Sequence, residues 1–436
     1  MKLSFLEPVT GGPGPWASVH LDTSRDIEDP DRAIALRWRQ LRAALRAQGA
    51  DEATVGALDD VVGADRAIPG RHGQALFAAH GRLGLAAELP DPPEHDTARF
   101  GPLPDTLPVA LAHAPDIPYL AVVLTRTAPP PGGGADTPRD GAGQVLVVGE
   151  AGRWPMSRIA PGRRLSRRLP VADWPRSAHQ VARDLADLAD GHRAEVVVVC
   201  RDAGDPWLSG VLVNRLPIQL QNSLTVVDND ASDVSDGIDV SEGSEGSEGS
   251  DGTDVSDLGD LDDRSEVSEE HDDRRATHDM NDEVDDGTES GHPAGRALAE
   301  AHVARVLDGC LSRADERHVD VFFTQRARHR HRSEGIAAAV TALQRGQAQA
   351  VLLSPPLRLP EHLWTGTRPD QIALTAAELR SFGTSDVRGE PAGSALLHAA
   401  VRTGADLVVL PPDETPLTDG VGVVLRYRDV TDLTVL

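Results

Sequence analysis

One stretch of this chain cannot contribute to a packed core, and it divides the sequence into two foldable parts. Between residues 228 and 291 there are 25 Asp or Glu residues against three arginines, and from Asp230 to Asp272 an acidic residue stands at every third position. A period of three matches neither a helix nor a strand. The remaining residues are mainly Ser and Gly, which bury too little apolar surface to offset the entropy lost on ordering. Residues 228–292 are therefore predicted to form a disordered acidic insert.

The insert also dominates the charge of the chain. The 436 residues carry a net charge of −26, and residues 228–291 account for −22 of it. The remainder is close to neutral, so the total does not exclude a basic face that binds RNA. Two interpretations of the insert remain open. It is either a triplet-repeat expansion without a dedicated function or an anionic mimic that shields a basic surface until RNA competes for it.

Cysteine usage and hydropathy favour a cytoplasmic protein. The chain has two cysteines, Cys200 and Cys310, no secretory segment after Met1, and no apolar run long enough to cross a bilayer. Reduced thiols and the absence of a membrane partner are expected. Cys200 ends the apolar run VVVVC, which predicts a buried, inert thiol.

Hydrophobic periodicity predicts a mixed α/β and α+β fold with three domains, two before the insert and one after it. The N-terminal α+β domain is expected over residues 1–115, the middle α/β domain over 116–227 and the C-terminal α/β domain over 293–436. Strands are expected at residues 17–21, 74–79, 82–88, 119–125, 144–148, 195–200, 223–227, 319–323, 350–353, 406–410 and 422–427. Helices are expected at residues 31–48, 51–62, 177–192, 205–215, 293–317, 334–345 and 394–402.

A basic segment in the middle domain carries the main candidate site. Residues 152–183 contain eight arginines, two tryptophans and a single acidic residue, and the prolines at 155, 161, 170 and 175 argue against a helix or a central strand. A basic loop is therefore predicted over residues 152–176, with a helix that begins at Ser177. Arginine forks match phosphate geometry and an indole can stack on a base, so the loop is interpreted as an RNA contact. The alternative is a solvated loop whose arginines pair with acidic neighbours.

A second basic cluster, RARHRHR at residues 326–332, is predicted to be a loop before a helix. The candidate RNA-binding residues from both clusters are Arg153, Trp154, Arg158, Arg163, Arg164, Arg167, Arg168, Trp174, Arg326, Arg328 and Arg330.

The sequence offers no metal site, cofactor or catalytic set. His329 and His331 flank Arg330, but a metal would need further ligands and the arginines repel a cation. Phosphate-loop, zinc-protease and dinucleotide motifs are not found in their required contexts. Gly-Gln pairs occur at residues 73–74, 143–144 and 346–347, each at the edge of a predicted element, where a structural role is expected.

Several stretches resemble one known family. They are ASVHLDTS (17–24), RAIALRWRQLRAALRAQGAD (32–51), HGQALFAAHG (72–81), GPLPDTLP (101–108), HRAEVVVVCRD (192–202), EGIAAAVTALQRGQAQAVLL (334–353), GADLVVLPP (404–412) and DGVGVVLRYR (419–428). The chain resembles the bacterial relatives of the archaeal and eukaryotic release factor and Pelota group, which include actinobacterial Vms-type peptidyl-tRNA hydrolases and Balon-like hibernation factors. The resemblance implies a three-domain translation factor that binds the ribosome and its RNA, with tRNA and elongation factor Tu as further candidate partners. By position, residues 152–168 would be the loop that reaches the peptidyl-transferase centre.

The chain departs from this family at the tip of that loop. Release factors carry Gly-Gly-Gln there, whereas this chain has Gly152-Arg153-Trp154-Pro155-Met156-Ser157 and no glutamine. An Arg-Trp-Pro tip cannot position a water molecule as a Gly-Gln backbone does, which argues against ester hydrolysis.

Three hypotheses follow. The first is a binding protein that occupies the A site of idle ribosomes during hibernation or stress. The second is an enzyme, either a peptidyl-tRNA hydrolase or a tRNA-cleaving rescue factor. The third is an interaction protein whose acidic tract recruits basic partners.

Overall fold

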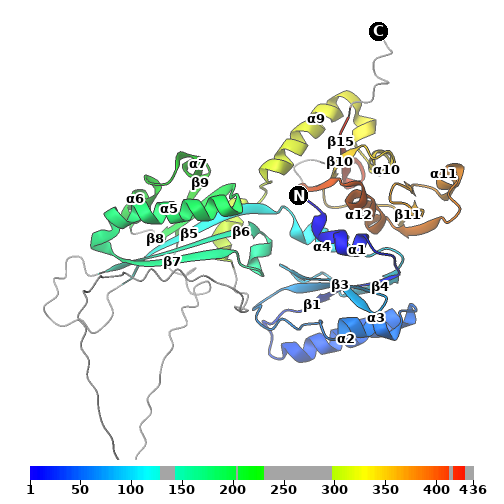
Figure 1. The fold of residues 1–436 in the computed structure, drawn as a ribbon, viewed down its shortest axis with the longest axis horizontal. Helices are drawn as coiled ribbons and strands as arrows, with labels where there is room; N and C mark the ends of the chain where they lie inside the picture. Colours follow the sequence, from blue (N-terminus) through cyan, green and yellow to red (C-terminus); the bar gives the residue numbers. More distant parts are fainter. Residues whose placement is uncertain (128–142, 203–204, 230–296, 412–415, 428–436) are drawn as a thin grey trace, which may run out of the picture. The chain divides into compact units, whose positions relative to one another are not determined.

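The computed structural model describes residues 1–127, 143–202, 205–229, 297–411 and 416–427 (Figure 1). Four β-sheets and the helices packed on them make up this part of the chain, which confirms the expected α/β and α+β class. Residues 230–292, most of the predicted insert, lie outside the described residues. In the part that is described, no helix is both long and apolar enough to cross a membrane.

The N-terminal sheet is antiparallel, with the strand order β3-β2-β1-β4. Its strands are β1 (Trp16–Asp22), β2 (Gly73–Ala79), β3 (Arg82–Leu89) and β4 (Thr97–Gly101). The helices are α1 (Glu7–Thr10), α2 (Pro30–Ala47), α3 (Glu52–Asp59) and α4 (Leu107–His113), and a 3₁₀ turn, η1 (Ser4–Leu6), precedes α1. The predicted spacing of α2 is confirmed, because Ile34, Trp38, Leu41 and Leu45 are its buried residues.

The middle sheet has the order β7-β6-β5-β8-β9, so β7 and β9 are its edges (Figure 1). Its strands are β5 (Ile117–Thr127), β6 (Gln144–Trp154), β7 (Arg163–Pro170), β8 (Val196–Asp202) and β9 (Leu224–Asn229). The helices are α5 (Trp174–His192), α6 (Pro206–Val213), α7 (Ile218–Gln221) and α8 (Glu300–Leu307). The core on one face contains residues of α5 and α6, and the core on the opposite face contains Val303 and Leu307 of α8. The chain after residue 296 therefore returns to the middle sheet.

The C-terminal part holds two small sheets, β14-β10-β15 and β12-β11-β13. Their strands are β10 (Ala348–Leu353), β11 (His362–Thr365), β12 (Ile372–Ala373), β13 (Arg388–Pro391), β14 (Asp406–Val409) and β15 (Val421–Leu425). The helices are α9 (Arg313–Ser333), α10 (Ile336–Gln344), α11 (Ala376–Ser381) and α12 (Ala392–Thr403), with a 3₁₀ turn, η4 (Thr418–Gly420), before β15.

The prediction of a basic loop over residues 152–176 is wrong. Strand β6 continues to Trp154, residues 163–170 form the edge strand β7, and two 3₁₀ turns, η2 (Met156–Arg158) and η3 (Val171–Asp173), flank β7. The prolines are compatible with this arrangement because Pro170 ends an edge strand, whose outer side needs no N–H donor for a sheet ladder. The following helix begins at Trp174 and not at Ser177, with Pro175 in its first turn, where a missing N–H costs nothing.

The predicted strand 319–323 and loop 326–332 are also wrong, because α9 runs through both. Ser312 caps this helix by accepting a hydrogen bond from the Asp315 backbone N–H. Within the apolar run, Phe322 is buried while Val321 and Phe323 are each 41% exposed, so only one side of the run faces the core. The composition of the run suggested a strand, but burial along α9 recurs at helical spacing, at Asp315, Val319 and Phe322. The helix predicted over residues 293–317 is likewise divided between α8 and α9.

Candidate RNA-binding surface

The edge strand β7 presents arginines on both of its faces. Leu165 and Leu169 pack against the core beneath α5, so the odd-numbered residues of the strand face that helix. Arg163 and Arg167 share this face, whereas Arg164 and Arg168 lie on the opposite face. We call these four residues, Arg163, Arg164, Arg167 and Arg168, the arginine edge.

Some of the predicted RNA-binding arginines are held by acidic side chains. Arg153 donates from Nε and Nη2 to Asp116 at 2.5 and 2.7 Å, and Arg167 approaches Asp184 at 3.5 Å. By contrast, Arg163 and Arg168 are exposed and have no acidic partner among the described residues. Pairing with acidic neighbours, the alternative to RNA binding, therefore accounts for some arginines of the segment. It does not account for Arg163 and Arg168 in the described part of the chain.

A buried carboxylate lies beneath the arginine edge. Glu150 on β6 is fully buried and accepts hydrogen bonds from Arg164 Nε at 2.7 Å, Tyr119 Oη at 3.1 Å and the Leu298 backbone N–H at 3.0 Å. Burial, followed by the charge of Glu150, raises the pKa of Tyr119 well above its ordinary value, so the phenol remains a donor. The sequence prediction did not include Glu150. A single acidic residue in the apolar run QVLVVGEAG was the available sign that a partner would be required.

The two predicted tryptophans differ in accessibility. Trp174 is fully buried in α5, and its indole N–H donates to the Leu208 carbonyl at 3.2 Å. A buried indole cannot stack on a base, so the prediction that Trp174 contacts RNA is wrong. Trp154, at the end of β6, is half-buried and packs against the core that contains Ile117 and Tyr119.

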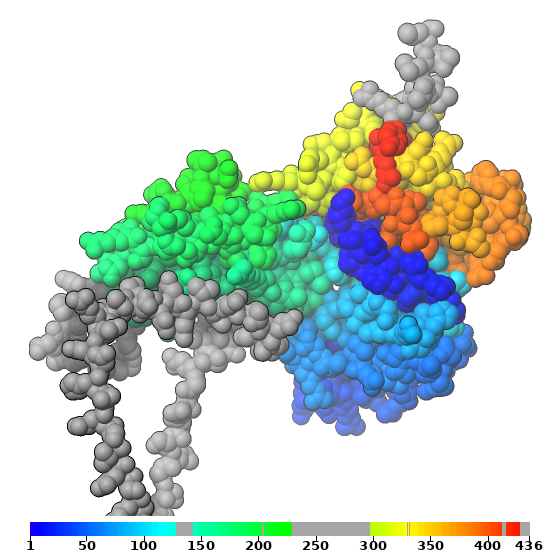
Figure 2. Space-filling model, viewed as in Figure 1, coloured from blue at the N-terminus to red at the C-terminus, as the bar shows by residue number. Residues whose placement is uncertain are grey.

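The second basic cluster lies on the C-terminal half of α9, whose surface is drawn in yellow in Figure 2. Arg330 donates from Nε to Glu334 at 2.9 Å, and Arg326 forms an ion pair with the same carboxylate, with its Nε at 2.8 Å. Arg328 is exposed without an acidic partner in the described part of the chain. The side chains of His329 and His331 lie outside the described residues. Where side chains are described, no group of three or more metal-binding residues is found.

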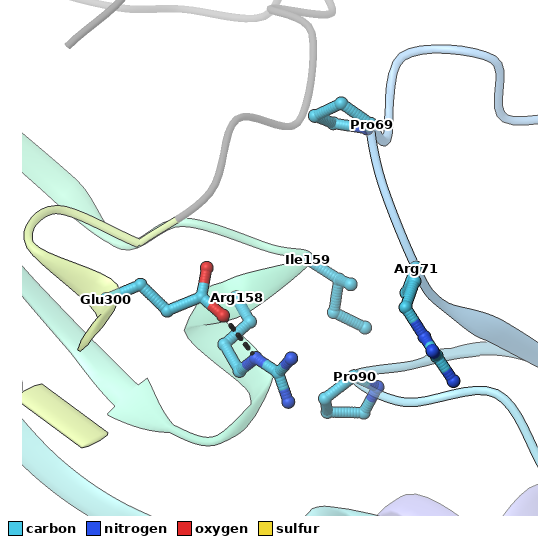
Figure 3. A pocket seen from close by; sticks show the side chains of 6 residues that line it. All are labelled: Pro69, Arg71, Pro90, Arg158, Ile159 and Glu300. Carbon is cyan, nitrogen blue, oxygen red and sulfur yellow. Dashed lines mark hydrogen bonds and ion pairs between the residues drawn. The ribbon is translucent and has the colours of Figure 1, made fainter. Parts of the chain in front are cut away.

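A small open hollow lies beside Arg158 (Figure 3). It is lined by Pro69, Arg71, Pro90, Arg158, Ile159 and Glu300. Arg158 donates from Nε to Glu300 at 2.7 Å and from Nη1 to Asp91 at 2.8 Å. These two carboxylates compensate the charge of Arg158, which therefore acts as a bridge between segments of the chain.

Cys200 and Gln74, two residues weighed as possible reactive groups, have structural roles. Cys200 is buried, as predicted, and burial raises the pKa of its thiol to about 12, which keeps it protonated. Of the Gly-Gln pairs, Gln74 is buried in β2 and donates to Glu88 at 2.6 Å and to the Val61 carbonyl at 3.1 Å. The described arrangement offers positive charge and hydrogen-bond donors for an anionic polymer.

Comparison with known protein families finds a match to the middle of the chain. The family described as Bacterial archaeo-eukaryotic release factor family 2 matches residues 119–241, which include most of β5 and all of β6 to β9. The uncharacterized proteins Rv2629 and MT2704 of Mycobacterium tuberculosis are 28% identical to this chain over 109 residues. That match spans 25% of this chain and 29% of the length of these relatives. The resemblance to the release factor and Pelota group is thus supported over the middle of the chain.

Two solved structures align along most of the chain at low similarity. A crystal structure of the archaeal translation termination factor aRF1 is 11% identical with a TM-score of 0.19, over 95% of this chain and 93% of that one. A model of ribosome-bound archaeal Pelota and ABCE1 is 12% identical with a TM-score of 0.33, over 97% and 93%. At these TM-scores neither likeness bears on the function of this protein.

Proposed function

We propose that this protein is a ribosome-binding translation factor of the release factor and Pelota group, which occupies the A site of idle cytoplasmic ribosomes during hibernation or stress. In this proposal the N-terminal and middle domains comprise residues 1–115 and 116–227. The C-terminal domain lies within residues 293–436, of which α8 packs on the middle sheet. The family match over residues 119–241 supports the general class. The observation that carries the proposal is the arginine edge, because an edge strand with guanidinium groups on both faces suits a phosphate-rich surface.

The chemistry of the contact is electrostatic and geometric. Arg163 and Arg168 have no acidic partner among the described residues, so they can approach phosphates without first breaking an ion pair. Each guanidinium offers a planar fork of donors that fits two phosphate oxygens. Binding should therefore weaken as salt rises, because each phosphate that is neutralised releases condensed counterions.

Binding without hydrolysis is the activity that these residues favour. The end of β6 carries Arg153 and Trp154 where release factors carry glycine and glutamine, and Asp116 holds the Arg153 guanidinium on its Nε side. The hydroxyl beside this tip, that of Ser157, is buried next to Tyr119, so it is not accessible to an ester bond of a substrate. Peptidyl-tRNA hydrolysis is the second hypothesis from the sequence, and ribosomes loaded with peptidyl-tRNA distinguish it from binding alone.

The test is co-sedimentation with vacant and with peptidyl-tRNA-loaded bacterial ribosomes over a range of salt concentrations. We expect Arg163→Ala combined with Arg168→Ala to weaken binding about tenfold and to reduce the salt slope by about two, because two phosphate contacts are lost. Arg32→Ala with Arg39→Ala, which removes the same charge from the exposed side of α2, is the matched control and should bind like wild type. Equal losses of affinity in both double variants would show that binding depends on net charge and not on the arginine edge. Release of peptide from loaded ribosomes would identify an enzyme.

A further inference from the structure

Glu334, between α9 and α10, is a buried acidic residue surrounded by donors. Its side chain is 2% exposed. It accepts hydrogen bonds from Arg330 Nε and Nη2 and from both the backbone N–H and the hydroxyl of Thr418, at distances of 2.8 to 3.4 Å. Arg326 adds an ion pair, with its Nε 2.8 Å from the carboxylate. Burial raises the pKa of Glu334, but the hydrogen bonds from Arg330 and Thr418 and the charge of Arg326 outweigh it and lower the pKa to about 2. Glu334 is therefore a fixed negative charge.

The contact with Glu334 orients the guanidinium of Arg330. Two of its nitrogens, Nε and Nη2, face the carboxylate at 2.9 and 3.4 Å, while the side chain as a whole is 68% exposed. A guanidinium is planar and has donors on more than one edge. When one edge is bound to a buried carboxylate, the outer edge is directed away from it and the side chain has already lost much of its rotamer freedom. Binding at the outer edge then costs less conformational entropy.

The surroundings of Arg330 attract an anion. Between Asp320 and Glu334 there is no acidic residue in the sequence, whereas four arginines occur over residues 326–332. Arg326, one helical turn before Arg330 and on the same side of α9, adds a second positive charge next to it. The best match is the phosphodiester backbone of RNA, which offers paired oxygens for a guanidinium fork and repeated charge along the strand.

We infer that Glu334 is a positioning residue, which holds Arg330 with its outer guanidinium edge ready to bind an RNA phosphate. This inference rests on the proposed RNA-binding function and adds a second contact on α9, together with the reason why an arginine is needed there. Lys at position 330 would keep the charge but would not supply a planar group that binds the carboxylate and the phosphate together.

The test compares two substitutions that conserve charge, with a labelled RNA duplex of about 20 base pairs as the probe and fluorescence anisotropy as the readout. Arg330→Lys should weaken binding about fivefold or more, and its salt slope should match that of wild type because the number of cations is unchanged. Arg328→Lys is the matched control and should stay within about twofold of wild type. Equal affinities for the two lysine variants would overturn the inference.

A second comparison separates positioning from stability. Thr418→Val removes one hydrogen bond to Glu334 without touching either arginine, and Glu334→Gln removes the charge. If Glu334 acts through Arg330, Thr418→Val should weaken RNA binding about twofold in the wild-type background and have no further effect in Arg330→Lys. A residue with only a structural role would lower the melting temperature and leave the affinity of the folded protein unchanged.

The duplex assay contains no ribosome, so the two proposals can fail separately. Loss of ribosome binding with the preference for Arg330 intact would overturn only the proposed function. Ribosome binding without that preference would overturn only the role of Glu334.

Discussion

At the scale of single residues, buried carboxylates determine what the arginines of this protein can do. Glu150 holds Arg164, and Glu334 holds Arg326 and Arg330. The arginines could be found in the sequence because charge clusters are visible there. The roles of the two glutamates could not be predicted, because their partners are distant in the sequence. The partners of Glu150 lie 14 residues or more away, and those of Glu334 include Thr418. The sequence thus shows the arginines without showing the groups that orient them.

The carboxyl group of Glu88 should make stability depend on pH in the N-terminal sheet. Burial raises the pKa of Glu88 to about 7, partly opposed by the hydrogen bond from Gln74. A carboxyl whose pKa is raised in the folded state stabilises the protein fully below its unfolded pKa, and this stability is lost as pH rises through about 7. The free energy of unfolding of wild type relative to Glu88→Gln should fall by about 1–3 kcal/mol between pH 4.5 and pH 7.5.

Urea denaturation at several pH values measures this difference. Glu94→Gln, which changes an exposed carboxylate after β3, is the control and should follow wild type. A constant difference between wild type and Glu88→Gln across this pH range would contradict the assignment.

At the scale of secondary-structure elements, the success of prediction depended on whether a pattern was local. The buried positions of α2 repeat with the helical period, and Asp29 caps the helix by accepting from the Arg32 backbone N–H, so sequence alone was sufficient. The run VDVFF in α9 has strand composition, and only the packing of Phe322 decides for a helix. For β7, prolines and arginines suggested a loop, and only pairing with β6 makes the segment a strand. The predicted arginines therefore lie on an edge strand and a helix, where loops were expected, and their contact with RNA remains a prediction.

The first turn of α5 gives a prediction at this scale. Trp174 is fully buried and donates to the Leu208 carbonyl, so Trp174→Phe should lower the free energy of unfolding by about 1–3 kcal/mol through the lost volume and hydrogen bond. RNA affinity, measured well below the melting temperature, should be that of wild type. Weaker RNA binding by a fully folded Trp174→Phe protein would contradict this prediction and indicate that Trp174 contributes to RNA binding.

At the scale of the whole molecule, the charge is distributed very unevenly along the chain. Residues 230–291 contain 24 acidic residues and three arginines, while the rest of the chain is close to neutral. Anionic residues tethered to an RNA-binding protein repel RNA over roughly a Debye length, about 10 Å at 0.1 M salt. The total charge of the chain should therefore oppose the RNA contacts that we propose for its arginines.

Removal of this charge should strengthen RNA binding at low salt. Replacing the acidic residues of 230–291 with Ser and Asn keeps the length and removes the repulsion, so affinity for the RNA duplex should rise several-fold at 50 mM salt and by little at 500 mM. The same substitutions in the Arg163→Ala and Arg168→Ala background should strengthen binding by a similar factor, because the effect acts at long range. An unchanged affinity at low salt would show that the tract does not influence RNA binding.

The return of the chain to the middle sheet has a consequence for how this protein can vary. Strand β9 ends at Asn229, and Leu298 already packs on the same sheet and donates its N–H to Glu150. For a connection with the disorder that its sequence predicts, the closure entropy grows only with the logarithm of its length, so halving or doubling the 67 residues between Asn229 and Ala297 should change stability by only about 0.6 kcal/mol. A change in the length of this tract should therefore be nearly neutral for folding, because both of its ends return to the same sheet.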